Sequence, residues 1–104
     1  MKTKTTNQRR NNMETQKTTL KLGQTLITPG ARDALHPEDV MVAMRRHASK
    51  DWGDCRLEDR EANDLALVEG ARVFSVYKDR FGTKFWIITE ADRSATTVLL
   101  PSEY

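Results

Sequence analysis

The chain has 104 residues, of which 38% are hydrophobic and 31% charged, a composition typical of one small globular domain. It has no apolar run near the roughly 20 residues of a membrane helix, and its one cysteine, Cys55, excludes an internal disulfide and a cysteine-based zinc site. Residues 1–18 carry five basic residues against Glu14, a net charge of +4, so the total of +2 leaves −2 for the rest. We therefore predict a cytoplasmic protein with a mildly acidic body and no membrane contact.

The first 18 residues contain no apolar side chain except Met1 and Met13 and are rich in Thr, Asn, Gln and Lys. Such a segment cannot bury enough surface to offset the entropy of ordering it. We predict a disordered basic tail over residues 1–18 and a single domain over residues 19–104. The tail is interpreted as a solubilising leader, or as an overlong start upstream of Met13. The alternative is an arm that contacts nucleic acid, the one route by which we expect such contact.

Local signals place an edge strand and two helices at the start of the domain. Strand-forming residues interrupted by Gly23 predict a short extended edge segment over residues 20–27. Each predicted helix begins at a polar residue followed by proline, at Thr28-Pro29 and at His36-Pro37. The helices are expected over residues 29–35 and 37–49. In the second, Val40, Ala43, Met44 and Ala48 share one face, and His47 falls on it.

A third helix is expected over residues 56–69, ended by Gly70. Before it, Trp52 in an acidic loop is expected to plug the core; if Trp52 or Trp86 is exposed, it is expected to anchor a protein partner. The expected inner positions of this helix are Asp59, Asn63, Ala66 and Leu67, with Ala62 and Leu65 widening the stripe.

Alternating patterns predict strands over residues 72–78, 84–90 and 95–100. The middle strand has bulk on both faces and is therefore expected to be central. The last two strands are joined by a polar corner at residues 89–94. Together these elements predict an α+β fold, with two to three helices packed on one face of a three- to four-stranded antiparallel sheet.

The C-terminal sequence is distinctive: WIITEADRS over residues 86–94, then Thr96-Thr97 and LLPSEY over residues 99–104. Shorter matches are Arg46-His47, DWGD over residues 51–54, and Glu58-Asp59 with Asn63. These segments resemble a family of small proteins encoded on plasmids, integrative elements and phage-like islands, and often described only as plasmid-related. The resemblance covers residues 20–104. It implies a bacterial mobile-element setting, with roles in evading host defence or maintaining the element, and it implies no activity.

The inner polar residues of the third helix need partners, because an unpaired buried polar group costs about 1–3 kcal/mol. Asp59 and Asn63 can find them in His47 or in the corner residues Arg93, Ser94 and Thr96. One interpretation is a structural network that fixes loop to sheet, and the other is a recognition pocket. The corner likewise allows a self-paired turn through Asp92 or Glu90 and Arg93, or an anion held by Arg93.

Asp51, Asp54, Glu58 and Asp59, with Glu90 and Asp92 if these lie near, provide oxygen ligands of the kind that Mg²⁺ or Ca²⁺ prefers. No calcium-loop motif and no H-x-x-x-H pair supports a metal site. His47 and Cys55 could form a base and nucleophile pair, but no residue is clearly placed to orient the imidazole.

We therefore expect a non-enzymatic protein-interaction module, with no cofactor, no metal and no catalytic residue assigned. Its partner would be a host or element-encoded protein, and its role would be to counter a host defence system. The alternative is a small metal-dependent hydrolase or nuclease-like enzyme that uses the Asp/Glu cluster. Oligomeric state stays open. The expected binding residues are His47, Trp52, Asp54, Asp59, Asn63, Glu90, Asp92, Arg93 and Ser94.

Overall fold

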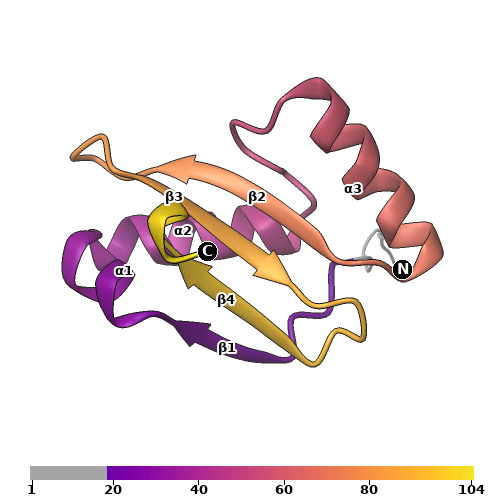
Figure 1. Cartoon of the computed structure of the whole chain (residues 1–104), viewed down its shortest axis with the longest axis horizontal. Helices are drawn as coiled ribbons and strands as arrows, with labels where there is room; N and C mark the ends of the chain where they lie inside the picture. Colours follow the sequence, from indigo (N-terminus) through magenta and orange to yellow (C-terminus); the bar gives the residue numbers. More distant parts are fainter. Residues whose placement is uncertain (1–18) are drawn as a thin grey trace, which may run out of the picture.

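The computed structural model describes residues 19–104 and shows three helices with a four-stranded sheet in the order β1-β4-β3-β2 (Figure 1). The strands are β1 (Gln24–Ile27), β2 (Val73–Lys78), β3 (Lys84–Thr89) and β4 (Ala95–Leu99). The helices are α1 (Pro29–Ala34), α2 (Pro37–Ala48) and α3 (Leu57–Glu69), followed at the C-terminus by the 3₁₀ turn η1 (Pro101–Glu103). This confirms the predicted α+β class. The predicted tail, residues 1–18, lies outside the described residues.

Strands β2, β3 and β4 form the predicted antiparallel meander, with β3 in the middle. Trp86 on β3 lies opposite Val76 on β2 and Leu99 on β4. On one face of β3, Phe85, Ile87 and Thr89 are fully buried. The central position inferred from bulk on both faces of this strand is therefore confirmed.

Strand β1 lies at the sheet edge, as expected, but it pairs parallel to β4, so the sheet is mixed and not purely antiparallel. Gln24 N donates to Ser94 O and Thr28 N donates to Val98 O. The chain can approach the backbone of residues 93–94 this closely only because residue 23 is glycine. Gly23 has φ +65°, and a Cβ there would lie 2.4 Å from Arg93 O and Ser94 O. Side-chain alternation does not encode strand direction, which explains why the sequence missed the parallel pair.

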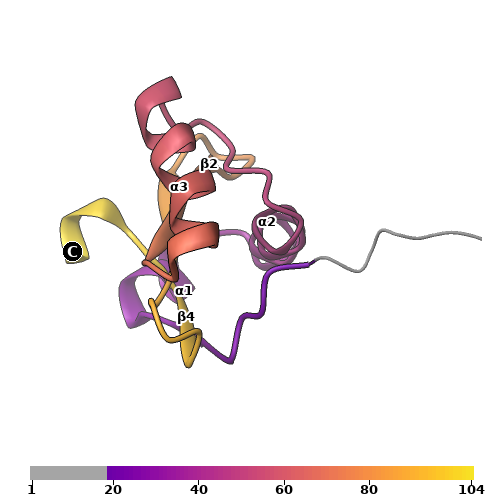
Figure 2. The same ribbon diagram turned by 90° about the vertical axis from the view of Figure 1, so that its right-hand side faces the viewer.

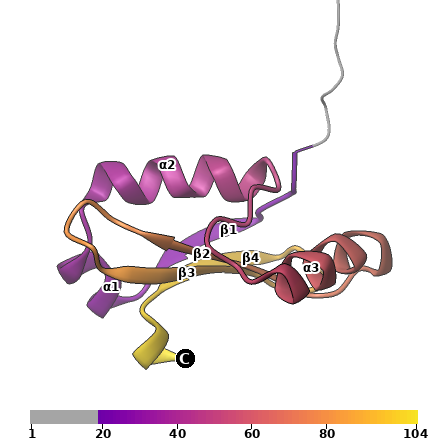
Figure 3. The ribbon, with the colours of Figure 1, turned by 90° about the horizontal axis from the view of Figure 1, so that it is seen from above.

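One face of the sheet is covered by α2, while η1 and the C-terminus lie on the opposite side (Figures 2 and 3). As the apolar periodicity predicted, Ala43 and His47 of α2 are buried, and Val40 and Met44 pack partly buried against the core. The core under this helix consists of Ala31, Leu35, Ala43, Tyr77, Phe85, Ile87 and Val98. No α-helix described in residues 19–104 lies across the other face, which carries only the short η1 turn and is called here the helix-free face.

Helix α3 lies beside β2 at the edge of the sheet, not on its face, which corrects the predicted packing (Figures 1 and 3). Asn63 Nδ2 donates to Phe74 O at 2.6 Å, and Asn63 Oδ1 accepts from Phe74 N at 3.1 Å. At the next outward-facing backbone position of β2, Val76 N donates to Trp52 O and Asp54 N donates to Val76 O. Together these bonds close the outer edge of β2 as a further strand would, and so protect it from pairing with another chain.

The position of α3 also changes its expected inner face. Asn63 and Ala66 are buried, and Asp59 and Leu67 are half-buried, as predicted. Ala62 and Leu65, which were expected to widen the inner stripe, are exposed. A helix at a sheet edge buries a narrower stripe than one that lies on a sheet face.

Replacing Asn63 by leucine should destabilise the domain by about 2 kcal/mol, because it leaves the edge N–H and C=O of Phe74 without partners. Urea unfolding followed by circular dichroism measures the change. Ala62→Leu on the exposed side of the same turn is the matched control and should stay within about 0.5 kcal/mol of wild type. A wild-type unfolding midpoint for Asn63→Leu would contradict the edge-closing role.

No helix among residues 19–104 combines the length and apolarity that crossing a membrane requires.

Candidate functional site

The predicted site residue His47 sits in a closed polar network between α2 and the sheet. Its Nε2 lies 2.8 Å from Thr89 Oγ1, and its Nδ1 lies 2.5 Å from Ser75 Oγ. The chain of bonds continues from Thr89 to Thr96 at 2.8 Å and from Thr96 Oγ1 to Leu22 O at 2.7 Å. His47, Ser75, Thr89 and Thr96 have no exposed surface.

The bond directions fix the histidine tautomer. A backbone carbonyl only accepts, so Thr96 donates to Leu22 O and must accept from Thr89. Thr89 in turn accepts from Nε2–H of His47, which leaves Nδ1 to accept from the Ser75 hydroxyl. Both ring nitrogens are therefore used within the domain.

Burial is the main cause that lowers the pKa of His47 to about 4, and the positive charge of Arg93 lowers it further. The imidazole is consequently neutral at neutral pH. Of the two interpretations of this polar network, the geometry favours the structural one, because His47 is fully buried and both its ring nitrogens are bonded within the domain.

Trp52 is the core plug that the sequence predicted, with 4% of its surface exposed. Its Nε1 donates to Asp64 Oδ1 at 3.0 Å, and its ring meets that of His47 edge-on at 5.7 Å. Like Asn63, Trp52 thus has intramolecular partners and too little surface to anchor a second protein.

The polar corner between β3 and β4 is self-paired. Arg93 donates from Nη1 to Ala71 O at 2.7 Å and to Glu90 O at 3.1 Å, and from Nη2 to Ala66 O at 3.3 Å. Ala66 lies in the last turn of α3, and its carbonyl also accepts from Gly70 N and Ala71 N. The guanidinium therefore ties the end of α3 to the corner and is occupied by carbonyl oxygens, which leaves the anion-binding interpretation without support.

Asp92 caps the same corner. Its Oδ1 accepts from Ser94 N at 3.0 Å, and hydrogen bonding by Ser94 holds the pKa of Asp92 below its usual value. These contacts make Asp92 and Ser94 local turn residues.

The carboxylates that were expected to gather lie in separate places, and two of them, Asp51 and Glu58, pair with Arg46 and Arg56. Asp54 and Asp59 line a groove on the helix-free face, whereas Glu90 and Asp92 belong to the corner and do not line it. Within residues 19–104, no three His, Cys, Asp or Glu side chains are close enough to hold a metal ion together. Cys55 is buried, and burial raises the pKa of its thiol.

The helix-free face carries a groove with an aromatic floor. One compartment of about 250 Å³ is lined by Arg72, Phe74, Trp86, Ile88 and Tyr104. A second compartment of about 300 Å³ shares Phe74 and Trp86 and is also lined by Asp54, Cys55, Arg56, Asp59, Val76, Lys84 and Pro101. Since the compartments share two aromatic walls, we describe them as one feature, the aromatic groove.

Three rings line the first compartment in a row. Trp86 contacts Phe74 at 5.8 Å and Tyr104 at 5.5 Å between ring centroids. Arg72 lies over the Tyr104 ring at 5.6 Å and donates to its hydroxyl at 2.7 Å. Tyr104 is itself 67% exposed, so the row runs from the sheet out to solvent.

The sequence did not predict this groove. Of the predicted site residues, only Asp54 and Asp59 line it. Two features of the sequence could have indicated the groove. The middle strand has large side chains on both faces, and only one predicted helix is strongly amphipathic and so able to cover a face. Two apolar faces with one covering helix leave one face open.

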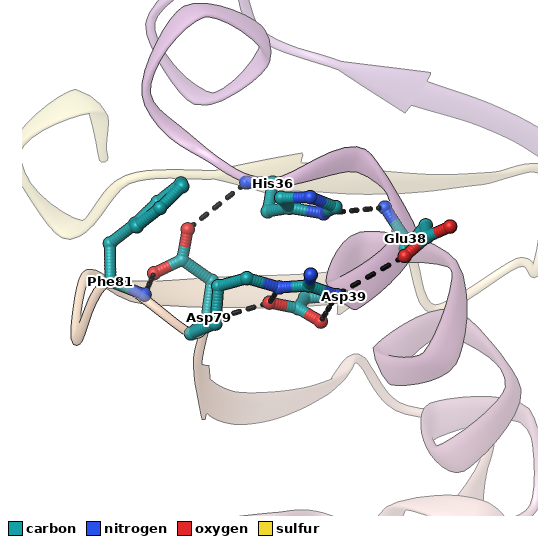
Figure 4. Close-up of polar contacts among 6 residues, drawn as sticks. His36, Glu38, Asp39, Asp79 and Phe81 are labelled. Carbon is teal, nitrogen blue, oxygen red and sulfur yellow. Dashed lines mark hydrogen bonds and ion pairs between the residues drawn. The ribbon is translucent and has the colours of Figure 1, made fainter.

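A second polar cluster joins the α1–α2 connection to the β2–β3 turn (Figure 4). Asp79, which is buried, accepts from the backbone N–H groups of His36, Phe81 and Thr83. Next to it, Arg80 bonds Asp39 and holds the pKa of that carboxyl at about 2. These bonds hold the β2–β3 turn against the start of α2.

Stability should depend on pH through His47. Its folded pKa of about 4 lies below the ordinary 6.5, so the unfolded chain binds the extra proton first. The resulting contribution is complete above about pH 6.5 and is lost as pH falls toward about 4, by roughly 2 kcal/mol between about pH 6.5 and 5. Urea unfolding across this range should show the slope in wild type and a reduced slope in His47→Gln. An equal slope in the two proteins would show that His47 titrates normally.

Comparisons of the chain with protein-family models, with curated proteins and with solved structures find no match.

Proposed function

We propose that this chain is a non-enzymatic protein-interaction module of the bacterial cytoplasm, and that its partner docks on the aromatic groove. The observation that carries the proposal is the groove itself. Phe74 and Trp86 are only half-buried there, and Tyr104 is largely exposed.

The composition of the groove is that of a protein-binding surface. Aromatic residues and arginine are enriched in the cores of protein interfaces, and a few such residues supply most of the binding energy. Here Trp86 and Tyr104 with Arg72 provide that combination. At the other end, Asp54 and Lys84 offer charges of both signs at the rim, where they can orient a partner.

The identity of the partner class rests on the sequence resemblance to plasmid-related proteins. That resemblance suggests a host or element-encoded protein, and a role in countering host defence. The segments that carry it, residues 86–94 and 99–104, supply Trp86, Ile88 and Tyr104 to the groove. The part of the chain that resembles the family most and the proposed docking surface thus overlap.

The alternative of a metal-dependent hydrolase requires Asp54, Asp59, Glu90 and Asp92 to converge. Glu90 and Asp92 lie outside the groove that the other two line, so no specific contact favours this alternative.

The proposal is tested by comparing affinities for a partner first captured from the bacterial host and then purified. The groove variant is Arg72→Glu with Tyr104→Ser, two exposed positions at which substitution leaves the core intact. Its affinity by titration calorimetry should fall by about tenfold or more, because it removes an aromatic anchor and reverses a charge.

Met41→Ser is the matched control, since Met41 is exposed on α2, which covers the opposite face of the sheet. It should bind like wild type. Equal affinities of wild type and the groove variant would remove the groove from the interface.

A further inference from the structure

The outward side of α3 carries apolar side chains that nothing in residues 19–104 covers. Leu57 is 59% exposed, Leu65 is 55% exposed and Val68 is 84% exposed. At about 100° per residue, these three side chains fall within an arc of about 80° on the helix, and the exposed Glu61 lies inside the same arc. We call the three apolar side chains the α3 stripe.

The same helix already buries another side. Asn63 and Ala66 face β2 and are buried, on the side of α3 opposite the stripe. A helix with apolar side chains on both sides is normally covered on both. The stripe therefore has the character of a contact surface without its partner.

Charge identifies the kind of partner. Helix α3 carries a net charge of −4, from five carboxylates and one cation, Arg60. Four of those carboxylates are exposed: Glu58, Glu61, Asp64 and Glu69. Glu69 stands in the last turn, where no basic residue is present and where the helix dipole disfavours negative charge. Basic side chains of a partner would reduce the repulsion among these carboxylates and between Glu69 and the helix dipole.

The charge also argues against other occupants. A second copy would bring another −4 to the same contact. Anionic lipid surfaces and nucleic acids attract basic faces and are repelled by this one. The chain's own residues 1–18 are basic, but Met1 and Met13 are their only apolar side chains, too few to cover the stripe.

We propose that the α3 stripe binds a basic amphipathic helix of a partner protein. Its apolar residues would pack on Leu57, Leu65 and Val68, and its Lys or Arg residues would lie against Glu61 within the stripe and the exposed carboxylates beside it. None of these residues lines the aromatic groove, so this surface is additional to the one in the proposed function. The module then has two docking surfaces.

The test measures binding of the full chain to a synthetic Leu/Lys peptide of about 14 residues, or four helical turns, with leucines on one helical face. Two control peptides are a scrambled sequence of the same composition and a Leu/Glu peptide with the same pattern. Fluorescence anisotropy at about 0.15 M salt should give at least a tenfold preference for the patterned Leu/Lys peptide over both controls. Equal binding of the scrambled peptide, or no binding of any, would overturn the proposal.

Variants separate the apolar from the charged contribution. Leu65→Ser with Val68→Ser keeps every carboxylate, and Glu61→Lys with Glu69→Lys keeps the stripe; each should weaken binding about tenfold. Asp33→Lys on α1 makes the same kind of charge change elsewhere and should bind like wild type, as should the groove variant. All substituted positions are exposed, and circular dichroism verifies folding.

Three results would overturn the proposal in favour of other occupants. Unchanged binding in the serine variant would make the contact a general charge effect. Tighter binding after deletion of residues 1–18 would identify the chain's own tail as the occupant. Concentration-dependent dimerisation lost in the serine variant would identify a second copy. Success or failure here is independent of the groove, because the groove variant leaves α3 intact.

Discussion

The buried imidazole of His47 is the contact on which the architecture depends. It joins α2 to two strands through Ser75 and Thr89, and the chain of hydroxyls then reaches Leu22 in the segment before β1. Five parts of the chain, including β4 through Thr96, thus share one line of buried hydrogen bonds. Such a network holds only if every member is satisfied, since each unpaired buried group would cost more than its bond contributes. A neutral imidazole, with one donor and one acceptor, meets that condition.

Helix α2 with His47 covers one face of the sheet only, and other contacts close the sheet edge and hold α3. The edge of β2 is closed by the Asn63 amide and by the backbone of residues 52–54. Arg93 then secures the end of α3 to the corner. Trp52, Asn63 and Arg93 were expected to take part in recognition, but their polar groups are bonded within the domain. The aromatic groove and the α3 stripe are what this arrangement leaves accessible.

Particular residues show why the elements were predictable. Helix ends depend on backbone groups only a few residues away. The structure therefore has the predicted helix starts at Thr28-Pro29 and His36-Pro37 and the predicted helix end at Gly70. The inner face of α2 and the burial of Trp52 follow equally directly from periodicity and side-chain size. Asn63 was correctly expected to find a partner, but the expected partners, His47 and the corner residues, were wrong: Asn63 pairs with the backbone of Phe74, which residue types cannot reveal in advance.

The sequence by itself determined the α+β class and the limits of the helices and strands to within one or two residues for most of them, because these depend on short-range bonding and side-chain period. Only the tertiary structure decided that β1 runs parallel to β4, that α3 stands beside the sheet, and that one face stays free of helices. These outcomes depend on how far α2 reaches across the sheet and on which backbone groups meet at an edge. Both are set by the packing of segments that lie far apart along the chain.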